Sequence, residues 1–132
     1  MNATSDALSL IGRIFLAVVF LVSGFGKIGG FEGVMGAIAS KGLPMAQVFA
    51  VATIIIEVGA ALMLVFGLKA RWAAFLLAAF TAIVTFFFHN FWAVPEAQKY
   101  MEQINFMKNL ALIGGLMFVM GFGPGRLSID KR

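Results

Sequence analysis

The segment from Met45 to Phe66 limits the fold of this chain more than any other, because its 22 residues include a single ionisable side chain, Glu57. About 20 mostly apolar residues in helical form cross the hydrocarbon core of a bilayer, so this segment is predicted to span a membrane. A carboxylate at that depth costs roughly 2.5–3.5 kcal/mol on insertion scales. Glu57 is therefore expected to face the interior of a helix bundle and to have a partner there.

The remaining sequence has the same apolar character. Hydrophobic residues make up 61% of the chain and charged residues only 12%, whereas soluble domains carry about 25% charged residues. The predicted fold class is an all-α membrane protein, a four-transmembrane-helix bundle formed by residues 1–132 as one domain. The predicted spans are residues 8–25, 45–66, 72–91 and 104–122.

The segments between the predicted spans have different characters. Phe31–Lys41 is too short to cross a bilayer, and its apolar residues recur at helical spacing, so it is predicted to be a short amphipathic segment in the interface between the first two spans. Trp72 and Trp92 lie 20 residues apart, about 30 Å along a helix, as expected for two interfacial belts around the third span. Residues 93–103 are predicted to be a polar loop. A cleaved signal peptide is an alternative for the first span, but Arg13 and the lack of a small-residue cleavage site argue against it.

Composition narrows the function classes. The chain has no cysteine and one histidine, which argues against thiol relays, iron–sulfur clusters and a dedicated metal site. The basic residues are scattered singly, which argues against nucleic acid as a partner. Positive charge at the ends of spans is instead the usual determinant of topology.

An even number of spans brings both termini to one side of the membrane. The basic residues on that side outnumber those on the other by five to four, or six with Arg13, so the termini are predicted to be cytoplasmic. The first group is Lys69, Arg71, Arg126, Lys131 and Arg132, and the second is Lys27, Lys41, Lys99 and Lys108.

Counting along the helices suggests a partner for Glu57. Arg13 lies about 8 Å from the cytoplasmic end of the first span, and Glu57 lies about 14 Å from the cytoplasmic end of the second. Antiparallel spans that follow each other in the chain are expected to be neighbours. The sequence therefore predicts a buried ion pair between Arg13 and Glu57. Two interpretations stay open: the pair fixes the register of the helices, or it faces a ligand.

A second polar cluster is predicted near the outer headgroup level, among aromatic residues. Its members are Lys27, His89, Asn105, Lys108 and Asn109. Two cations, an imidazole and two amides could bind an anionic or carbonyl-bearing amphiphile, such as a quinone ring or a lipid headgroup. Taken singly, the lysines are also explained by snorkelling and the aromatic residues by an interfacial belt.

Several short motifs, in this order and spacing, resemble those of the DoxX family of small bacterial inner-membrane proteins. They are Arg13, Gly24-x-x-Lys27, Glu57-x-Gly59, Gly67-x-x-x-Arg71, Phe88-His89, Phe106-x-Lys108-Asn109, Gly114-Gly115 and Gly123-Pro124-Gly125-x-x-Ser128-x-Asp130. The resemblance covers nearly the whole chain. It implies a four-helix bundle in the bacterial cytoplasmic membrane and an association with redox chemistry, since the related DoxD name belongs to a subunit of thiosulfate:quinone oxidoreductase.

The sequence contains no recognisable catalytic motif, so the residues and the resemblance together leave three functional hypotheses. The first is an accessory subunit that binds a quinone or lipid between its helices. The second is a catalytic subunit of a quinone-linked oxidoreductase complex with a soluble redox partner. The third is a small proton or solute carrier that uses Glu57 and His89. Membrane lipids and other copies of the chain are further candidate partners.

Overall fold

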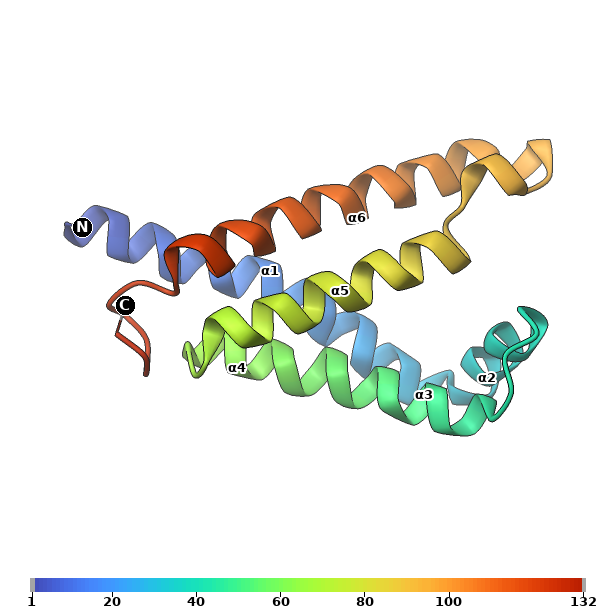
Figure 1. Cartoon of the computed structure of the whole chain (residues 1–132), viewed down its shortest axis with the longest axis horizontal. Helices are drawn as coiled ribbons and strands as arrows, with labels where there is room; N and C mark the ends of the chain where they lie inside the picture. Colours follow the sequence, from blue (N-terminus) through green and yellow to red (C-terminus); the bar gives the residue numbers. More distant parts are fainter. Residues whose placement is uncertain (1, 132) are drawn as a thin grey trace.

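A computed structural model describes residues 2–131, which form an all-helical bundle with both termini at the same end (Figure 1). The helices are α1 (Ala3–Gly29), α2 (Phe31–Ser40), α3 (Ala46–Ile55), α4 (Ala61–Phe66), α5 (Ala70–Phe88) and α6 (Glu96–Phe122). A π-helical turn, Ile56–Ala60, joins α3 to α4, and a 3₁₀ turn, Phe91–Ala93, follows α5.

Four helical segments are long and apolar enough to cross a membrane, as the sequence predicts: Ala3–Gly29, Ala46–Phe66, Ala70–Ala93 and Glu96–Phe122. Because α3, the π-turn and α4 continue one another, they form the second of these segments. The fold class is therefore a four-transmembrane-helix bundle. The segment between the first two spans is helical as well, in α2, and Ile38 is its buried residue.

The predicted boundaries differ from the structure mainly in the last span. Residues 93–103 are not a polar loop, because α6 begins at Glu96 and its first two turns carry the polar side chains. Helix α1 also extends beyond the predicted 8–25 at both ends. The predicted boundaries are shorter because hydropathy identifies only the part of a helix that faces lipid. Backbone hydrogen bonds extend the helix beyond that part.

Small side chains dominate the core of the bundle. Alanines 17, 60, 61, 70, 73, 74 and 78 are buried together with Phe20, Leu64, Leu77, Leu116 and Val119. In lipid, helices gain little from the hydrophobic effect and associate by close packing, which small residues permit. Large apolar side chains such as Phe15, Val22 and Phe118 are more than 65% exposed and form the surface that faces lipid.

At the end that holds the termini, polar side chains satisfy the backbone groups left unpaired at helix ends. Arg13 Nη1 donates to the carbonyls of Leu64 and Val65 at 2.9 Å each, and Nη2 donates to the carbonyl of Leu127. Asp130 accepts from the backbone amides of Lys69 and Ala70, both at 2.9 Å, at the start of α5. Because unpaired backbone groups are costly in a membrane, these bonds hold the C-terminal tail against the bundle.

Replacing Arg13 by Met should destabilise the protein, because the carbonyls of Val65 and Leu127 lose this donor and the carbonyl of Leu64 keeps only the backbone amide of Gly67. Each buried acceptor left unpaired costs about 1–3 kcal/mol, so a loss of a few kcal/mol is expected. The measurement is unfolding by sodium dodecyl sulfate in mixed micelles. Arg126→Met, at an exposed position of the same tail, is the control and should change stability little.

Candidate functional site

The buried carboxylate of Glu57 forms an ion pair with the ammonium group of Lys27. Only 3% of the Glu57 side chain is exposed, against 27% of the Lys27 side chain. Lys27 Nζ also donates to Ser23 Oγ at 2.8 Å, one turn earlier on α1. The cation thus lies at the end of the first span and reaches inward to a carboxylate held near the middle of the second.

The backbone around Glu57 departs from regular helical geometry. Glu57 lies in the π-helical turn Ile56–Ala60, and such turns occur frequently at functional sites. Gly24 of α1 packs directly against this turn: a Cβ on Gly24 would lie 2.6 Å from Val58 Cγ2 and 3.3 Å from Glu57 Cβ. The absence of a side chain at Gly24 therefore allows α1 to approach closely enough for Lys27 to reach Glu57.

The predicted ion pair between Arg13 and Glu57 is wrong, because each of the two residues has a different partner. Glu57 pairs with Lys27, while Arg13 Nη1 and Nη2 donate to three backbone carbonyls. The physical reason is that the end of α4 leaves carbonyls without intrahelical donors, and Arg13 lies beside them. Glu57 is nine residues from the end of α4 at Phe66 and eleven from the start of α3 at Ala46, so a cation at either end of α1 could have reached it.

A cavity of about 520 Å³ opens beside this ion pair, between α1, α5 and α6. Its polar lining consists of Ser23, Lys27, Glu57, Thr81, His89, Lys108 and Asn109. Its apolar lining includes Val18 and Val22, which are 45% and 68% exposed. Because these valines belong to the lipid-facing surface of α1, the cavity can be reached from the bilayer. We call it the polar cavity.

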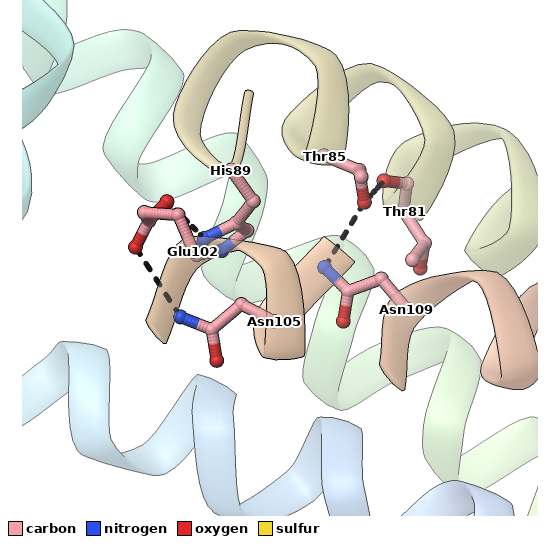
Figure 2. A network of polar contacts seen from close by, with 6 residues as sticks. All are labelled: Thr81, Thr85, His89, Glu102, Asn105 and Asn109. Atoms are coloured by element: carbon pink, nitrogen blue, oxygen red, sulfur yellow. Dashed lines mark hydrogen bonds and ion pairs between the residues drawn. The ribbon is translucent and has the colours of Figure 1, made fainter. Parts of the chain in front are cut away.

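A hydrogen-bond network connects α5 to α6 along one side of the polar cavity (Figure 2). His89 Nδ1 lies 3.1 Å from Glu102 Oε2, and Asn105 Nδ2 lies 3.3 Å from Glu102 Oε1. Deeper in the bundle, Asn109 Nδ2 donates to Thr85 Oγ1 at 3.0 Å. Since Glu102 contacts Nδ1 of His89, the carboxylate orients the imidazole at the cavity wall.

Four of the five residues predicted as the outer polar cluster line this cavity: Lys27, His89, Lys108 and Asn109. The fifth, Asn105, is not in the lining but bonds to Glu102 behind His89. Asn109 also lies deeper than the predicted headgroup level, thirteen residues after the start of α6. Whether these residues bind a ligand stays a prediction.

Sequence reasoning missed Glu57 as a member of this cluster, and it missed Glu102 because residues 93–103 were expected to be a loop. A signal for Glu102 exists in the sequence. Glu102, Asn105 and Asn109 are spaced i, i+3, i+7, which places their side chains on one face of a helix. The pair Thr81 and Thr85, at i and i+4, marks the matching face of α5.

Aromatic side chains pack the connection between α5 and α6 next to His89. The ring of Phe106 lies 5.4 Å from that of Phe91 and 5.7 Å from that of Trp92, both edge to face. Trp92 also contacts Phe86 at 6.2 Å. These contacts hold the 3₁₀ turn against α6 and thereby keep His89 close to Glu102.

Comparisons with known proteins identify relatives that match most of the chain. The model of the DoxX family matches residues 8–90. The inner membrane protein YphA of Escherichia coli (strain K12) is 33% identical over 131 residues, which cover 99% of this chain and 94% of that protein. YqjF, another inner membrane protein of the same strain, is 33% identical over 131 residues and covers 99% and 95%.

A partial match extends to eukaryotes. The Surfeit locus protein 4 homolog of Schizosaccharomyces pombe is 32% identical over 80 residues, which are 59% of this chain and 26% of that protein. No solved structure matches the chain. The similarity to the two bacterial proteins, which covers 99% of this chain, spans all four membrane segments, including α6, which lies wholly outside the residues that the family model matches.

Replacing Lys27 by Met should destabilise the protein more than replacing Glu57 by Gln, because the first change leaves the more deeply buried charge without its partner. Breaking a buried ion pair costs roughly 3–5 kcal/mol, whereas removing both charges is often close to neutral. The double variant is therefore expected to recover most of the loss. Unfolding free energies of the four proteins in mixed micelles measure this cycle, and additive losses in the double variant would contradict the pairing.

Proposed function

This chain belongs to the DoxX family of membrane proteins, and from this membership and the geometry of the polar cavity we propose that it binds the ring of a quinone between its helices. One observation carries the proposal. Hydrogen-bond donors from three helices and one buried carboxylate converge on a single cavity of about 520 Å³ whose remaining lining is apolar and includes the exposed Val18 and Val22. Sites for small molecules typically combine apolar walls with a few converging polar groups.

The mixture of donors and acceptors fits a quinone better than a lipid phosphate. The carbonyl oxygens of a quinone accept hydrogen bonds, which Lys108, His89 and Asn109 can donate. When the ring is reduced to a quinol, its hydroxyl groups donate, and Glu57 can accept. An anionic headgroup would instead meet the carboxylate of Glu57 in the same cavity, and Glu57 already neutralises Lys27.

In electron transfer at the membrane, the protein would act as an accessory subunit that holds the quinone for a redox complex. A partner oxidoreductase, such as a soluble dehydrogenase, would supply the two electrons that, with two protons, reduce the bound quinone to a quinol. Gentle purification followed by mass spectrometry tests both parts: a quinone in the organic extract supports binding, and a copurifying oxidoreductase supports the accessory role. An extract that contains phospholipid but no quinone would contradict the proposal.

A second candidate function follows from the carboxylate and the imidazole that line the polar cavity. Glu57 and His89 both line it, so a small proton or solute carrier is the alternative. Ionisable side chains inside membrane segments often belong to proton pathways. Reconstituted vesicles separate the two candidates: a pH gradient that decays through the wild-type protein, but not through a folded Glu57→Gln variant, favours the carrier.

Obstructing the polar cavity should weaken quinone binding with little effect on stability. Val22→Trp places an indole at the mouth of the cavity, on a side chain that is 68% exposed. A loss in affinity of about tenfold or more is expected for ubiquinone carrying two isoprene units, which corresponds to about 1.4 kcal/mol. Equilibrium binding to the protein in lipid nanodiscs provides the measurement.

The matched control for this variant is Leu8→Trp. Leu8 is also on α1 and is 64% exposed, but it lines a different cavity. This control should bind the short-chain ubiquinone as the wild type does. Equal affinities of Val22→Trp and wild type would place the binding site elsewhere.

A further inference from the structure

A second cavity, of about 510 Å³, lies between α1 and α6 on the side of the chain termini. Gly12 and Leu16 of α1 form one wall, and Gly115, Phe118 and Val119 of α6 form the other. Apart from Ser9 and the buried Arg13, whose Nη1 and Nη2 donate to backbone carbonyls, its lining is apolar. We call it the apolar cavity.

The two cavities follow the same helix faces. On α1, Gly12 and Leu16 of the apolar cavity are followed at helical spacing by Phe20, Ser23 and Lys27 of the polar cavity. On α6, Lys108 and Leu112 of the polar cavity are followed by Gly115, Val119 and Phe122 of the apolar one. Residues three or four apart share a helix face, so one groove between α1 and α6 contains both cavities.

Leu16 packs tightly against Gly115 at the boundary between the two cavities. A Cβ on Gly115 would lie 3.0 Å from Leu16 Cδ2, so the leucine side chain fits there only because position 115 is glycine. A Cβ on the neighbouring Gly114 would have nothing within 4 Å. Along both helices this contact lies between the residues of the apolar cavity and those of the polar cavity.

Helix α6 is held to the bundle in a way that leaves this groove free to open. Its polar bonds go to α5: Asn109 with Thr85, Glu102 with His89, and Arg71 with the carbonyls of Met120 and Gly121. Within residues 2–131, no hydrogen bond or ion pair joins α6 to α1. Around the apolar cavity, α1 and α6 therefore face each other mainly through apolar side chains, and hydrocarbon can replace these contacts at little cost.

We propose that the apolar cavity holds the isoprenoid chain of the quinone whose ring occupies the polar cavity. This inference rests on the proposed function and adds to it the class of ligand: a quinone with a single long chain. From Lys27 to Leu8, α1 rises 19 residues, or about 28 Å, close to the thickness of the hydrocarbon core. A groove with one narrow passage fits one chain, whereas the two acyl chains of a phospholipid would need a wider one.

The test compares two probes, ubiquinone with two isoprene units and ubiquinone with eight, binding to the protein in nanodiscs. Because the bilayer is as apolar as the groove, the chain gains only packing contacts, and an advantage of about tenfold for the long chain is expected. In Gly115→Val, which fills the passage beside Leu16, this advantage should disappear while the short-chain affinity stays unchanged. Gly114→Val, at the neighbouring position with open space, should keep the advantage.

A second variant guards against misfolding of Gly115→Val. A Cβ on Gly12, in the wall of the apolar cavity, would have nothing within 4 Å, so Gly12→Phe can fill the cavity without a clash. It should also remove the advantage of the long chain and leave short-chain binding intact.

The possible outcomes separate this inference from the proposed function. Wild-type protein that binds both probes equally, or variants that keep the preference for the long chain, would overturn the assignment of the apolar cavity but leave the ring site standing. Cross-linking from position 12 that captures a phospholipid acyl chain or a second copy of the protein would also overturn the assignment of the apolar cavity. Wild-type protein that binds neither probe would contradict the proposed function itself.

Discussion

The position of Glu57, a charge in the middle of a membrane span, imposes the main constraint on this structure. Its carboxylate must have a cation close by, since an unpaired charge at that depth would oppose insertion of the helix. Lys27 provides the cation, and it does so from the end of α1 because the glycine at position 24 lets the two backbones come together at the π-turn. The ion pair, the glycine and the irregular turn are thus parts of one arrangement that holds α1 against the second span.

The cations of this chain have two separate tasks. At the end that holds the termini, Arg13 and Arg71 donate to carbonyls at the ends of α4 and α6, and the planar, multidentate guanidinium suits that task. At the opposite end, Lys27 and Lys108 face the polar cavity, one paired with Glu57 and both on flexible stems. The first group stabilises helix ends, and the second group defines the electrostatics of the cavity.

Most of the fold could be predicted from sequence, because hydrophobic segments of sufficient length have one stable arrangement in a bilayer. The grouping of Lys27, His89, Lys108 and Asn109 at one cavity also follows from span order and from counting residues. The partner of Glu57 could not be predicted in this way, since Glu57 lies near the middle of its span and Arg13 and Lys27 lie at opposite ends of α1. Which cation pairs with Glu57 depends on the close approach of α1 at Gly24 and on the carbonyls at the end of α4, which accept hydrogen bonds from Arg13. Hydropathy reveals neither feature. The position of Glu102 in the site could not be predicted, because polar residues in the first turns of a helix have the same composition as a loop.

The distribution of polar bonds explains why the cavities occur between α1 and α6 rather than elsewhere. Polar bonds hold the bundle as two pairs: α1 with the second span, through Arg13 and Lys27, and α5 with α6, through Asn109 and Glu102. Between the two pairs, the core of small residues packs α4 closely against α5, whereas no hydrogen bond or ion pair joins α1 to α6 within residues 2–131. Polar bonds fix distances between helices, whereas apolar contacts in lipid can be exchanged for contacts with a hydrocarbon chain. A ligand that enters from the bilayer would therefore meet the least resistance along the α1–α6 groove, and that groove leads to the buried carboxylate.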